Sequence, residues 1–351
     1  MASELILITG TTGFIGIKIL GLALNAGYHV RAPVRSEAKG HHLRSNKFIA
    51  SFAAGARLET PVIEDITVDG AFDEVLKSVT FVIHTASTLP GQGLAPEEFN
   101  AKLIKPARMG TTSLLYSAIK TPSVKRVVIT SSGAAVVEWK YFFRESTDKV
   151  YTANDRAPFE TEYPDGDSQA YSASKVAALA ATEDFIEKEK PHFDVVTLIP
   201  GFVFGRNETA DSVETVLSGS NRLAFGQVLG NKTNIGPSVV CHVDDVAAVH
   251  LKAATDLSIP GNRAYAISSG PPGEPKIADA LDVVKKYFPE RVADGTLPCT
   301  GFHDSQRVLL DASETERVFG MKFKPYEEGV KDFTAQYLEF LDASSGAKTT
   351  G

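Results

Sequence analysis

The glycine-rich segment TGTTGFIG, residues 9–16, is the feature that most constrains the fold of this chain. It follows LILIT (residues 5–9), a short apolar run typical of a strand, and it opens an apolar pattern over residues 13–27 that predicts a helix ended by Gly27. Glycines at such a junction allow a tight turn, and the helix N-terminus offers free N–H groups to a pyrophosphate. The GxxGxxG spacing is one residue longer than the commoner GxGxxG, so the strand–loop–helix context carries the interpretation. The segment predicts a dinucleotide site.

The first half of the chain alternates strand-like and helix-like patterns, as a parallel α/β sheet requires. Further strands are predicted at residues 28–35, 57–63, 80–87, 124–132 and 193–200, and helices over residues 99–120 and 169–188. Residues 201–237 read as loops. A strand and helix over residues 238–255, a strand at 263–269 and helices over 277–288 and 326–341 complete the chain.

These elements predict a doubly wound parallel Rossmann sheet with a smaller, interleaved α/β part. We expect an NADP-binding domain over residues 1–200 and a mainly substrate-binding part over residues 201–345, with residues around 238–256 returning to the first domain. Residues 346–351 read as a polar tail.

Composition limits the partners of this chain. Its 351 residues are 43% hydrophobic and 23% charged, and a formal net charge of −7 gives no general attraction to nucleic acid or anionic lipid. No run approaches the ~20 apolar residues that span a bilayer, and the N-terminus does not resemble a signal peptide. Cys241 and Cys299 lack metal-ligand spacing, so no metal site is predicted and a reducing cytoplasm is the simplest location.

The end of the second predicted strand, VRAPVRS, bears on the choice between NAD and NADP. An acidic side chain there accepts a hydrogen bond from the adenosine 2′-hydroxyl, whereas a basic one neutralises a 2′-phosphate. Arg35 lies directly at the strand end, where its guanidinium can make paired charge-assisted bonds, and Lys39 follows shortly after. Glu37 is the competing residue. We favour Arg35, and therefore NADP.

Two tyrosine–lysine pairs have the same spacing, and both cannot serve one reaction. Tyr116 and Lys120, in YSAIK, end a helix that leads into a strand, which places them at the N-terminal edge of the sheet. Ligands of open parallel sheets bind at the opposite edge, where the strands end. Tyr171 and Lys175, in YSASK, follow a strand that ends at this edge, so we predict them as the functional pair.

Tyr171 and Lys175 share one helix face, with side-chain bases roughly 5–6 Å apart. Ketone reduction needs a hydride on carbon and a proton on oxygen; a serine hydroxyl can hold the oxygen while a tyrosine supplies the proton. Ser132, at the preceding strand end, is the predicted serine, and Ser131 is the alternative. A phenol titrates near 10, and bringing its pKa to about 7 takes roughly 4 kcal/mol. Lys175 and an oxidised nicotinamide ring would supply the positive charge.

The motifs TGTTGFIG, ITSS, YSASK and IPGFVFG, followed by HVDDVAAVH, resemble the extended branch of the short-chain dehydrogenase/reductase family over almost the whole chain. IKPARMG and VRAPVR look like the group that contains dihydroflavonol 4-reductases and fungal carbonyl, ketone and aldehyde reductases. The resemblance implies that Ser132, Tyr171 and Lys175 are catalytic. It also implies adenine contacts from Asp65 and Ile66. The implied cofactor-binding set is Gly10, Thr12, Gly13, Phe14, Ile15, Gly16, Arg35, Lys39, Asp65, Ile66, Thr85, Ala86, Ser87, Thr130, Tyr171, Lys175, Pro200 and Val203.

The chain departs from this group at three places. Leu179 stands where many relatives carry a glutamate four residues after the lysine, and Val137 replaces an asparagine that plant dihydroflavonol reductases use for their flavonoid. The NWYCYGK run of cinnamoyl-CoA reductases is absent. These departures do not change the predicted reaction type, but the substrate of these relatives cannot be assigned to this chain. Phe202 and Phe204, after the strand at residues 193–200, are our candidates for the border of the substrate pocket.

We therefore predict an enzyme that uses NADPH to reduce a ketone or aldehyde, a small molecule, with Tyr171 as the proton donor. An NADP-linked secondary alcohol or hydroxysteroid-type dehydrogenase and a sugar-nucleotide epimerase are the alternative enzymes. A nucleotide-sensing protein is the alternative outside enzymes; it would not need Ser132, Tyr171 and Lys175 together. The sequence does not specify the oligomeric state.

Overall fold

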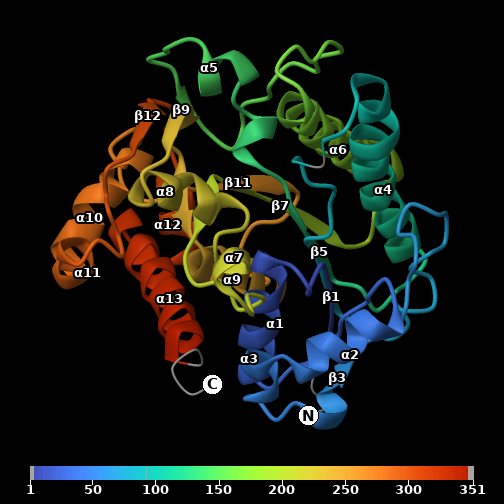
Figure 1. Cartoon of the computed structure of the whole chain (residues 1–351). Coiled ribbons are helices and arrows are strands. Elements are labelled where there is room, and N and C mark those ends of the chain that lie inside the picture. The colour runs from blue at the N-terminus through green and yellow to red at the C-terminus, as the bar shows by residue number, and fades with distance from the viewer. Residues whose placement is uncertain (1–3, 92, 347–351) are drawn as a thin grey trace. The chain divides into compact units, whose positions relative to one another are not determined.

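The computed structural model describes residues 4–91 and 93–346, and these divide into two compact units (Figure 1). The first unit takes in the described residues of Met1–Trp139, with Ala153–Ile199 and Ala247–Tyr265. The second takes in Lys140–Thr152, Pro200–Val246 and the described residues of Ala266–Gly351.

A seven-stranded parallel sheet forms the centre of the first unit, in the order β11-β7-β5-β4-β1-β2-β3. Its inner strands are apolar runs that are buried on both faces, as a sheet between helical layers requires. From β1 the chain adds β2 and β3 on one side, and it then returns to add β4 on the other side of β1. The strand order therefore reverses between β1 and β4, and ligands of such sheets bind at the carboxyl ends of the strands at this switch point. The predicted fold class is confirmed. The strands are β1 (Leu5–Thr9), β2 (His29–Arg31), β3 (Leu58–Glu59), β4 (Phe81–His84), β5 (Arg126–Thr130), β7 (Asp194–Pro200) and β11 (Arg263–Ile267).

The helices of the first unit follow the predicted order. Gly27 has a φ of +87°, the left-handed conformation that commonly ends a helix, and it lies just after the first of them. The long helices α4 and α6 pack side by side, and a π-helical turn at Asn100–Ile104 leads into α4. The bounds are α1 (Phe14–Asn25), α2 (Glu37–Ser45), α3 (Lys47–Ala50), α4 (Lys105–Ile119), α6 (Asp167–Glu189) and α9 (Val243–Thr255).

A buried arginine fixes the beginning of β5. The guanidinium of Arg126 donates to the carbonyl oxygens of Ala253 (3.2 Å) and Asp256 (3.0 Å), which lie at the C-terminal end of α9. It also pairs with Asp194 at 2.8 Å. Because helix C-termini carry carbonyl groups without intrahelical partners, this arginine satisfies the helix end and ties it to the sheet.

The second unit is built from short strand pairs and helices around a core that includes Phe204, Phe225, Val330 and Phe333. Strand β6 (Val150–Tyr151) pairs with β13 (Leu309–Leu310), β8 (Phe202–Phe204) with β10 (Val240–His242), and β9 (Lys232–Pro237) with β12 (Phe302–Gln306). The helices are α5 (Trp139–Phe143), α7 (Val213–Val216), α8 (Ser220–Val228), α10 (Ala280–Tyr287), α11 (Pro289–Ala293), α12 (Ser313–Phe319) and α13 (Tyr326–Gly346).

Three sequence predictions about these elements need correction. Residues 201–237 are not mainly loops, because they contain β8, α7, α8 and β9. The second and third strands are shorter than predicted. Beyond β2 the pairing continues through the N–H of Ala32, which donates to Glu59 O at 2.8 Å, and an isolated bridge between Val34 and Val62. Short elements like these depend on partners far away in the sequence, which local patterns do not reveal.

The boundary of the first unit also differs from the predicted residues 1–200. Lys140–Thr152 clusters with the second unit, since β6 pairs with β13 and Arg307 forms an ion pair with Asp148 at 3.2 Å. The segment that returns to the first unit is Ala247–Tyr265, whereas we expected residues around 238–256. The predicted polar tail begins at the last residue of α13, and residues 347–351 lie outside the described residues. No helix within residues 4–91 and 93–346 is long and apolar enough to cross a membrane.

Candidate functional site

The loop between β1 and α1 is too tight for side chains at Gly10 and Gly16. Gly10 has a φ of +74°, and a Cβ there would lie 2.4 Å from Thr85 Oγ1. A Cβ on Gly16 would lie 2.2 Å from Gly10 O, and the N–H of Gly13 donates to the same oxygen at 2.9 Å. Gly13 precedes α1 without a capping side chain, and the first turn carries no acidic residue. The positive end of the helix is therefore available to an anion. Thr12 is exposed on the loop, and Phe14 and Ile15 begin the helix half-buried.

The basic residues after β2 have different surroundings. Arg31 has a structural role, because its guanidinium pairs with Glu59 at 2.6 Å and donates to Val75 O at 2.8 Å. Arg35 and Lys39 are exposed, and Arg35 lies close enough to Asp65 for its charge to act on that carboxyl. The pKa of Asp65 is lowered, first by hydrogen bonds from Thr67 and then by Arg35.

The neighbouring candidates for contact with the adenosine part of the cofactor are Glu37, at the start of α2, and Asp65 and Ile66, in the loop after β3. Glu37, the competitor of Arg35, is exposed at the first position of α2, where its charge suits the helix N-terminus. Ile66 is half-buried and packs against Gly110 of α4, where an added Cβ would lie 3.1 Å from its Cδ1. Asp65 is exposed.

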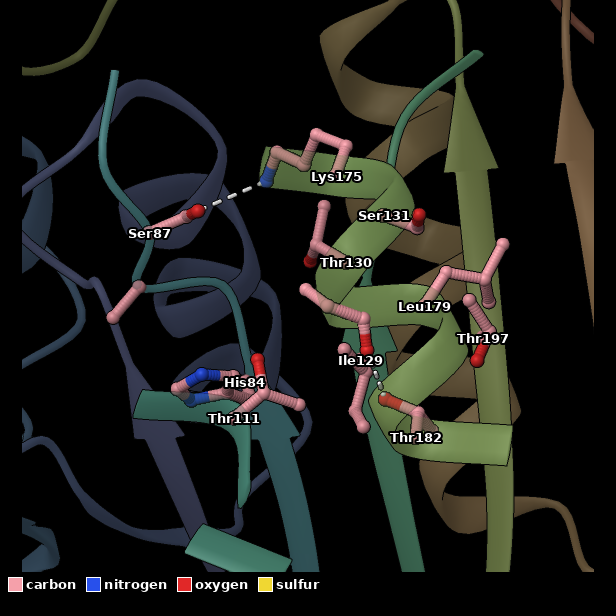
Figure 2. A pocket seen from close by; sticks show the side chains of 12 residues that line it. His84, Ser87, Thr111, Ile129, Thr130, Ser131, Lys175, Leu179, Thr182 and Thr197 are labelled. Carbon is pink, nitrogen blue, oxygen red and sulfur yellow. Dashed lines mark hydrogen bonds between the residues drawn. The ribbon is translucent and has the colours of Figure 1, made fainter. Parts of the chain in front are cut away.

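The segment after β4 is joined to the glycine loop by hydrogen bonds. Thr85 Oγ1 donates to Thr9 O at 2.7 Å, and the N–H of Ala86 donates to Thr9 Oγ1 at 3.2 Å. Ser87 Oγ accepts a hydrogen bond from Lys175 Nζ at 3.0 Å, as Figure 2 shows. The ends of β1 and β4 and the helix α6 thus meet at the switch point of the sheet.

Ser132, Tyr171 and Lys175 come together beside this edge. Ser132 follows β5, caps a short helical turn by accepting from the N–H of Ala134 at 3.2 Å, and forms a hydrogen bond with Tyr171. Lys175 lies one turn further along α6, with Nζ 5.4 Å from the ring centroid of Tyr171. Ser131 is buried and lines a pocket with Lys175 instead, so Ser132 is the serine on the tyrosine side.

Burial dominates the electrostatics of this cluster. It raises the pKa of Tyr171 to about 12, although the hydrogen bond with Ser132 acts in the opposite direction. It lowers the pKa of Lys175 to about 8. The sequence analysis expects nearby positive charge to lower the pKa of Tyr171. In the protein without cofactor, the pKa is raised instead, because burying a charged phenolate costs more free energy than its surroundings return. Thr130, also predicted near the cofactor, is bonded through its hydroxyl to His250 Nε2 at 2.7 Å.

The second tyrosine–lysine pair has different partners. Tyr116 is 46% exposed and bonds to Glu189 at 3.3 Å, while Lys120 forms an ion pair with Asp73 at 3.1 Å. Burial and the charge of Glu189 raise the pKa of Tyr116. The pair therefore stabilises the contacts of α4 with its neighbours and does not meet the glycine loop.

The remaining predicted site residues belong to the second unit. Pro200 ends β7, and Val203 is buried in β8. Phe204 is only 1% exposed and packs against Tyr326 with ring centroids 5.2 Å apart, which gives it a core role and corrects its prediction as a pocket residue. Phe202 is half-buried and stays a candidate.

A group of possible metal ligands also lies in this unit. The ligand atoms of His242, Asp244 and Asp332 are within 4.8 Å of one another. However, Lys324 pairs with Asp244 at 2.7 Å, and His242 already accepts from the N–H of Asp244 at 3.1 Å. These bonds give the group a structural explanation.

Two residues near the switch point were not among the predicted site residues. Thr11 Oγ1, in the glycine loop, is buried and has no hydrogen-bond partner within the described part of the chain. His84 ends β4 and lines the pocket that Lys175 also lines. Its position three residues before Ser87 was the available signal, because a strand ending at the ligand edge presents its last residues there.

Known reductases are similar to this chain over nearly its whole length. The chain is 36% identical over 357 residues to the ketoreductase CTB6 of Cercospora nicotianae, covering 99% of both proteins. It is 30% identical over 356 residues to a Candida albicans protein named as the NADPH-dependent methylglyoxal reductase GRP2, covering 96% of this chain and 99% of that one. The structure of the yeast methylglyoxal/isovaleraldehyde reductase Gre2 with NADPH has the same fold, with a TM-score of 0.80, 24% identity, and coverage of 97% of this chain and 99% of that one.

The family assignment rests on the pattern of residues 6–268, which matches the NAD dependent epimerase/dehydratase family. This stretch contains the glycine loop, Ser132 and the Tyr171–Lys175 pair. The resemblance to extended short-chain dehydrogenases/reductases is thereby confirmed. The chain belongs to the NAD dependent epimerase/dehydratase family.

Proposed function

We propose that this chain reduces a ketone or aldehyde to an alcohol with NADPH, and that Tyr171 is the proton donor. The observation that carries the proposal is the meeting of Ser132, Tyr171 and Lys175 beside the switch point of the sheet. The relatives named as ketoreductase and as NADPH-dependent reductase support the reaction class and the cofactor.

The cofactor site that we propose consists of residues of the first unit, with Pro200 and Val203 as further candidates. Gly10, Gly13 and Gly16 make room for a pyrophosphate at the N-terminus of α1. Arg35 and Lys39 are exposed cations at the end of the second strand, where they would bind a 2′-phosphate. When bound, NADPH supplies the hydride.

The chain's own residues handle the oxygen of the substrate. Ser132 and Tyr171 hold the carbonyl oxygen by hydrogen bonds, which orients the carbon and stabilises the charge that develops on oxygen. With a pKa of about 12, Tyr171 is protonated at neutral pH and able to donate to the alkoxide. Lys175 then stabilises the phenolate that remains, 5.4 Å from its ring centroid.

The second unit is our candidate for substrate binding, with Phe202 as its first residue to test. Both cysteines are unpaired and buried, which fits the cytoplasmic location that we propose.

The test is a screen of purified protein with NADPH against α-dicarbonyls, β-ketoesters and aryl ketones, followed by the loss of cofactor absorbance. We expect consumption with at least one class and much slower consumption with NADH. If NADPH binds but no carbonyl is reduced, the proposal is wrong.

The family description also admits an epimerase. An epimerase restores its cofactor in each turnover, so a sugar nucleotide would be converted without net loss of NADPH absorbance. Net consumption in proportion to alcohol formed would exclude this alternative.

A further inference from the structure

Ser172 follows Tyr171 on α6 and forms a hydrogen bond to a different part of the chain. Successive residues of an α-helix point about 100° apart, so Ser172 projects from another side of the helix than Tyr171. Its side chain is 5% exposed, and its hydroxyl donates to Ala134 O at 2.9 Å. That carbonyl belongs to the short helical turn Gly133–Ala135, which directly follows Ser132.

The hydrogen bonds of Ala134 connect the two side chains that we propose to hold the substrate oxygen. The N–H of Ala134 donates to Ser132 Oγ at 3.2 Å, and its carbonyl oxygen accepts from Ser172. Ser132 is also hydrogen-bonded to Tyr171. These three hydrogen bonds and the peptide link between Tyr171 and Ser172 form a closed ring.

Backbone hydrogen bonds hold the same turn from other directions. The N–H of Ser131 donates to Leu198 O of β7 at 2.7 Å, and the N–H of Ala157 donates to Ala135 O at 3.0 Å. These two bonds restrain the turn relative to the sheet and to the loop at Ala157, but neither of them involves α6. The bond from Ser172 restrains the turn relative to the helix, against which it packs.

We propose that Ser172 is a positioning residue, which holds the turn after Ser132 against α6 so that Ser132 Oγ and Tyr171 Oη can bind one carbonyl oxygen. Ser172 acts through the backbone of Ala134 and touches neither substrate nor cofactor. Displacing a catalytic group by about 1 Å can cost roughly 10²-fold in rate, so one restraint at this place matters. The kinetic consequence rests on the proposed reductase function, whereas the restraint on the turn does not.

Ser172→Ala removes the hydroxyl and leaves the helix intact, because alanine is the best helix former. We expect kcat to fall roughly three- to tenfold, the equivalent of one net hydrogen bond. The KM for NADPH should change less than about twofold, since the variant leaves the glycine loop and Arg35 untouched. An unchanged kcat, with active wild-type protein, would refute the positioning role and leave the proposed function in place.

Thr182→Val is the matched control. Thr182 is another buried hydroxyl residue of α6, 1% exposed, and it donates to Ala178 O at 2.9 Å, so its bond stays within the helix. The variant should leave kcat within about twofold of the wild type. A loss as large as that of Ser172→Ala would mean that α6 responds to the removal of any buried hydroxyl, and it would overturn the specific role of Ser172.

A double variant shows whether Ser172 acts through Ser132. Ser132→Ala removes the side chain that Ser172 is proposed to position. In this background, Ser172→Ala should lower kcat less than about twofold further, because the two changes remove one function. A further loss as large as in the wild-type background would assign the effect to another group and refute the proposal.

Hydrogen exchange tests the restraint without an assay of turnover. The N–H groups of Ala135 and Val136 donate within the turn at 2.9 and 3.1 Å, so they exchange when the turn opens. We expect exchange roughly three- to tenfold faster in Ser172→Ala and unchanged in Thr182→Val. Exchange at the wild-type rate in Ser172→Ala overturns the inference. Faster exchange in a chain that reduces no carbonyl would support the restraint and contradict the proposed function.

Discussion

The two tyrosine–lysine pairs of this chain have the same spacing and almost the same sequence, YSAIK and YSASK, yet their surroundings are opposite. Tyr116 and Lys120 are exposed; Tyr116 donates a hydrogen bond to Glu189, and Lys120 forms an ion pair with Asp73. Lys175 is 5% exposed, donates to the Ser87 hydroxyl and lies 5.4 Å from the ring centroid of Tyr171. The comparison teaches that two pairs with the same spacing acquire different environments from the fold, and only the pair at the switch point has the burial and the partners that the proposed acid–base role requires.

The largest expected difference between the pairs is in turnover. Tyr171→Phe removes the proposed acid and should lower kcat by roughly 10²–10⁴-fold with little effect on NADPH affinity, whereas Tyr116→Phe should leave kcat within about twofold. Steady-state kinetics with cofactor titration by fluorescence measures both. A large loss in Tyr116→Phe, or none in Tyr171→Phe, would show that we chose the wrong pair.

The second-largest effect is expected on cofactor binding, and it tests whether the site that contains Tyr171 and Lys175 takes NADPH in preference to NADH. Arg35→Ala removes the exposed guanidinium at the strand end, so the KM for NADPH should rise roughly 10–100-fold, the worth of charge-assisted bonds. The KM for NADH should hardly change, and Arg31→Lys provides a control at the structural arginine. An equal rise for both cofactors would assign the 2′-phosphate to another residue.

The free energy of unfolding should respond to the loss of Lys175 and hardly at all to the loss of Lys120. The pKa of Lys175 falls from 10.5 to about 8 on folding, so its charge costs the folded state about 3 kcal/mol below pH 8, and this cost disappears above pH 10.5. Lys175→Met should therefore raise the free energy of unfolding at pH 7 by about 1–3 kcal/mol while abolishing turnover. Urea unfolding at pH 7 and pH 10 checks the sign: the wild type should gain stability over this interval and the variant should not.

The smallest effect is expected at the other lysine. Lys120 and Asp73 form an exposed ion pair at 3.1 Å, and such pairs contribute roughly 0–1 kcal/mol. Lys120→Met should change the unfolding free energy by less than about 0.5 kcal/mol and leave kcat unchanged. A loss above about 2 kcal/mol would mean that this pair supports the fold more than its exposure indicates.

The sequence predicted the strand–helix framework of the first unit because its signals are local. The apolar run of β1, Gly27 after α1 and the long pattern of α6 each depend on neighbours within a few turns. The elements between Phe202 and Pro237 escaped prediction because β8 and β9 are held by partners far along the chain, β10 and β12.

For the candidate site, residue types were predictable but their environments were not. Spacing could not separate Ser131 from Ser132, which differ only in the direction that each side chain takes after β5. It could not foresee that burial raises the pKa of Tyr171, since burial is a property of the folded chain.

The most direct test of the account is a crystal structure of this chain with NADPH and a non-reactive ketone analogue. We predict that the ketone oxygen lies within hydrogen-bond distance of Tyr171 Oη and Ser132 Oγ, with its carbon about 3–3.5 Å from the nicotinamide carbon that carries the hydride. A nicotinamide that lies far from Tyr171, or a ketone held by other residues, would contradict the central claim.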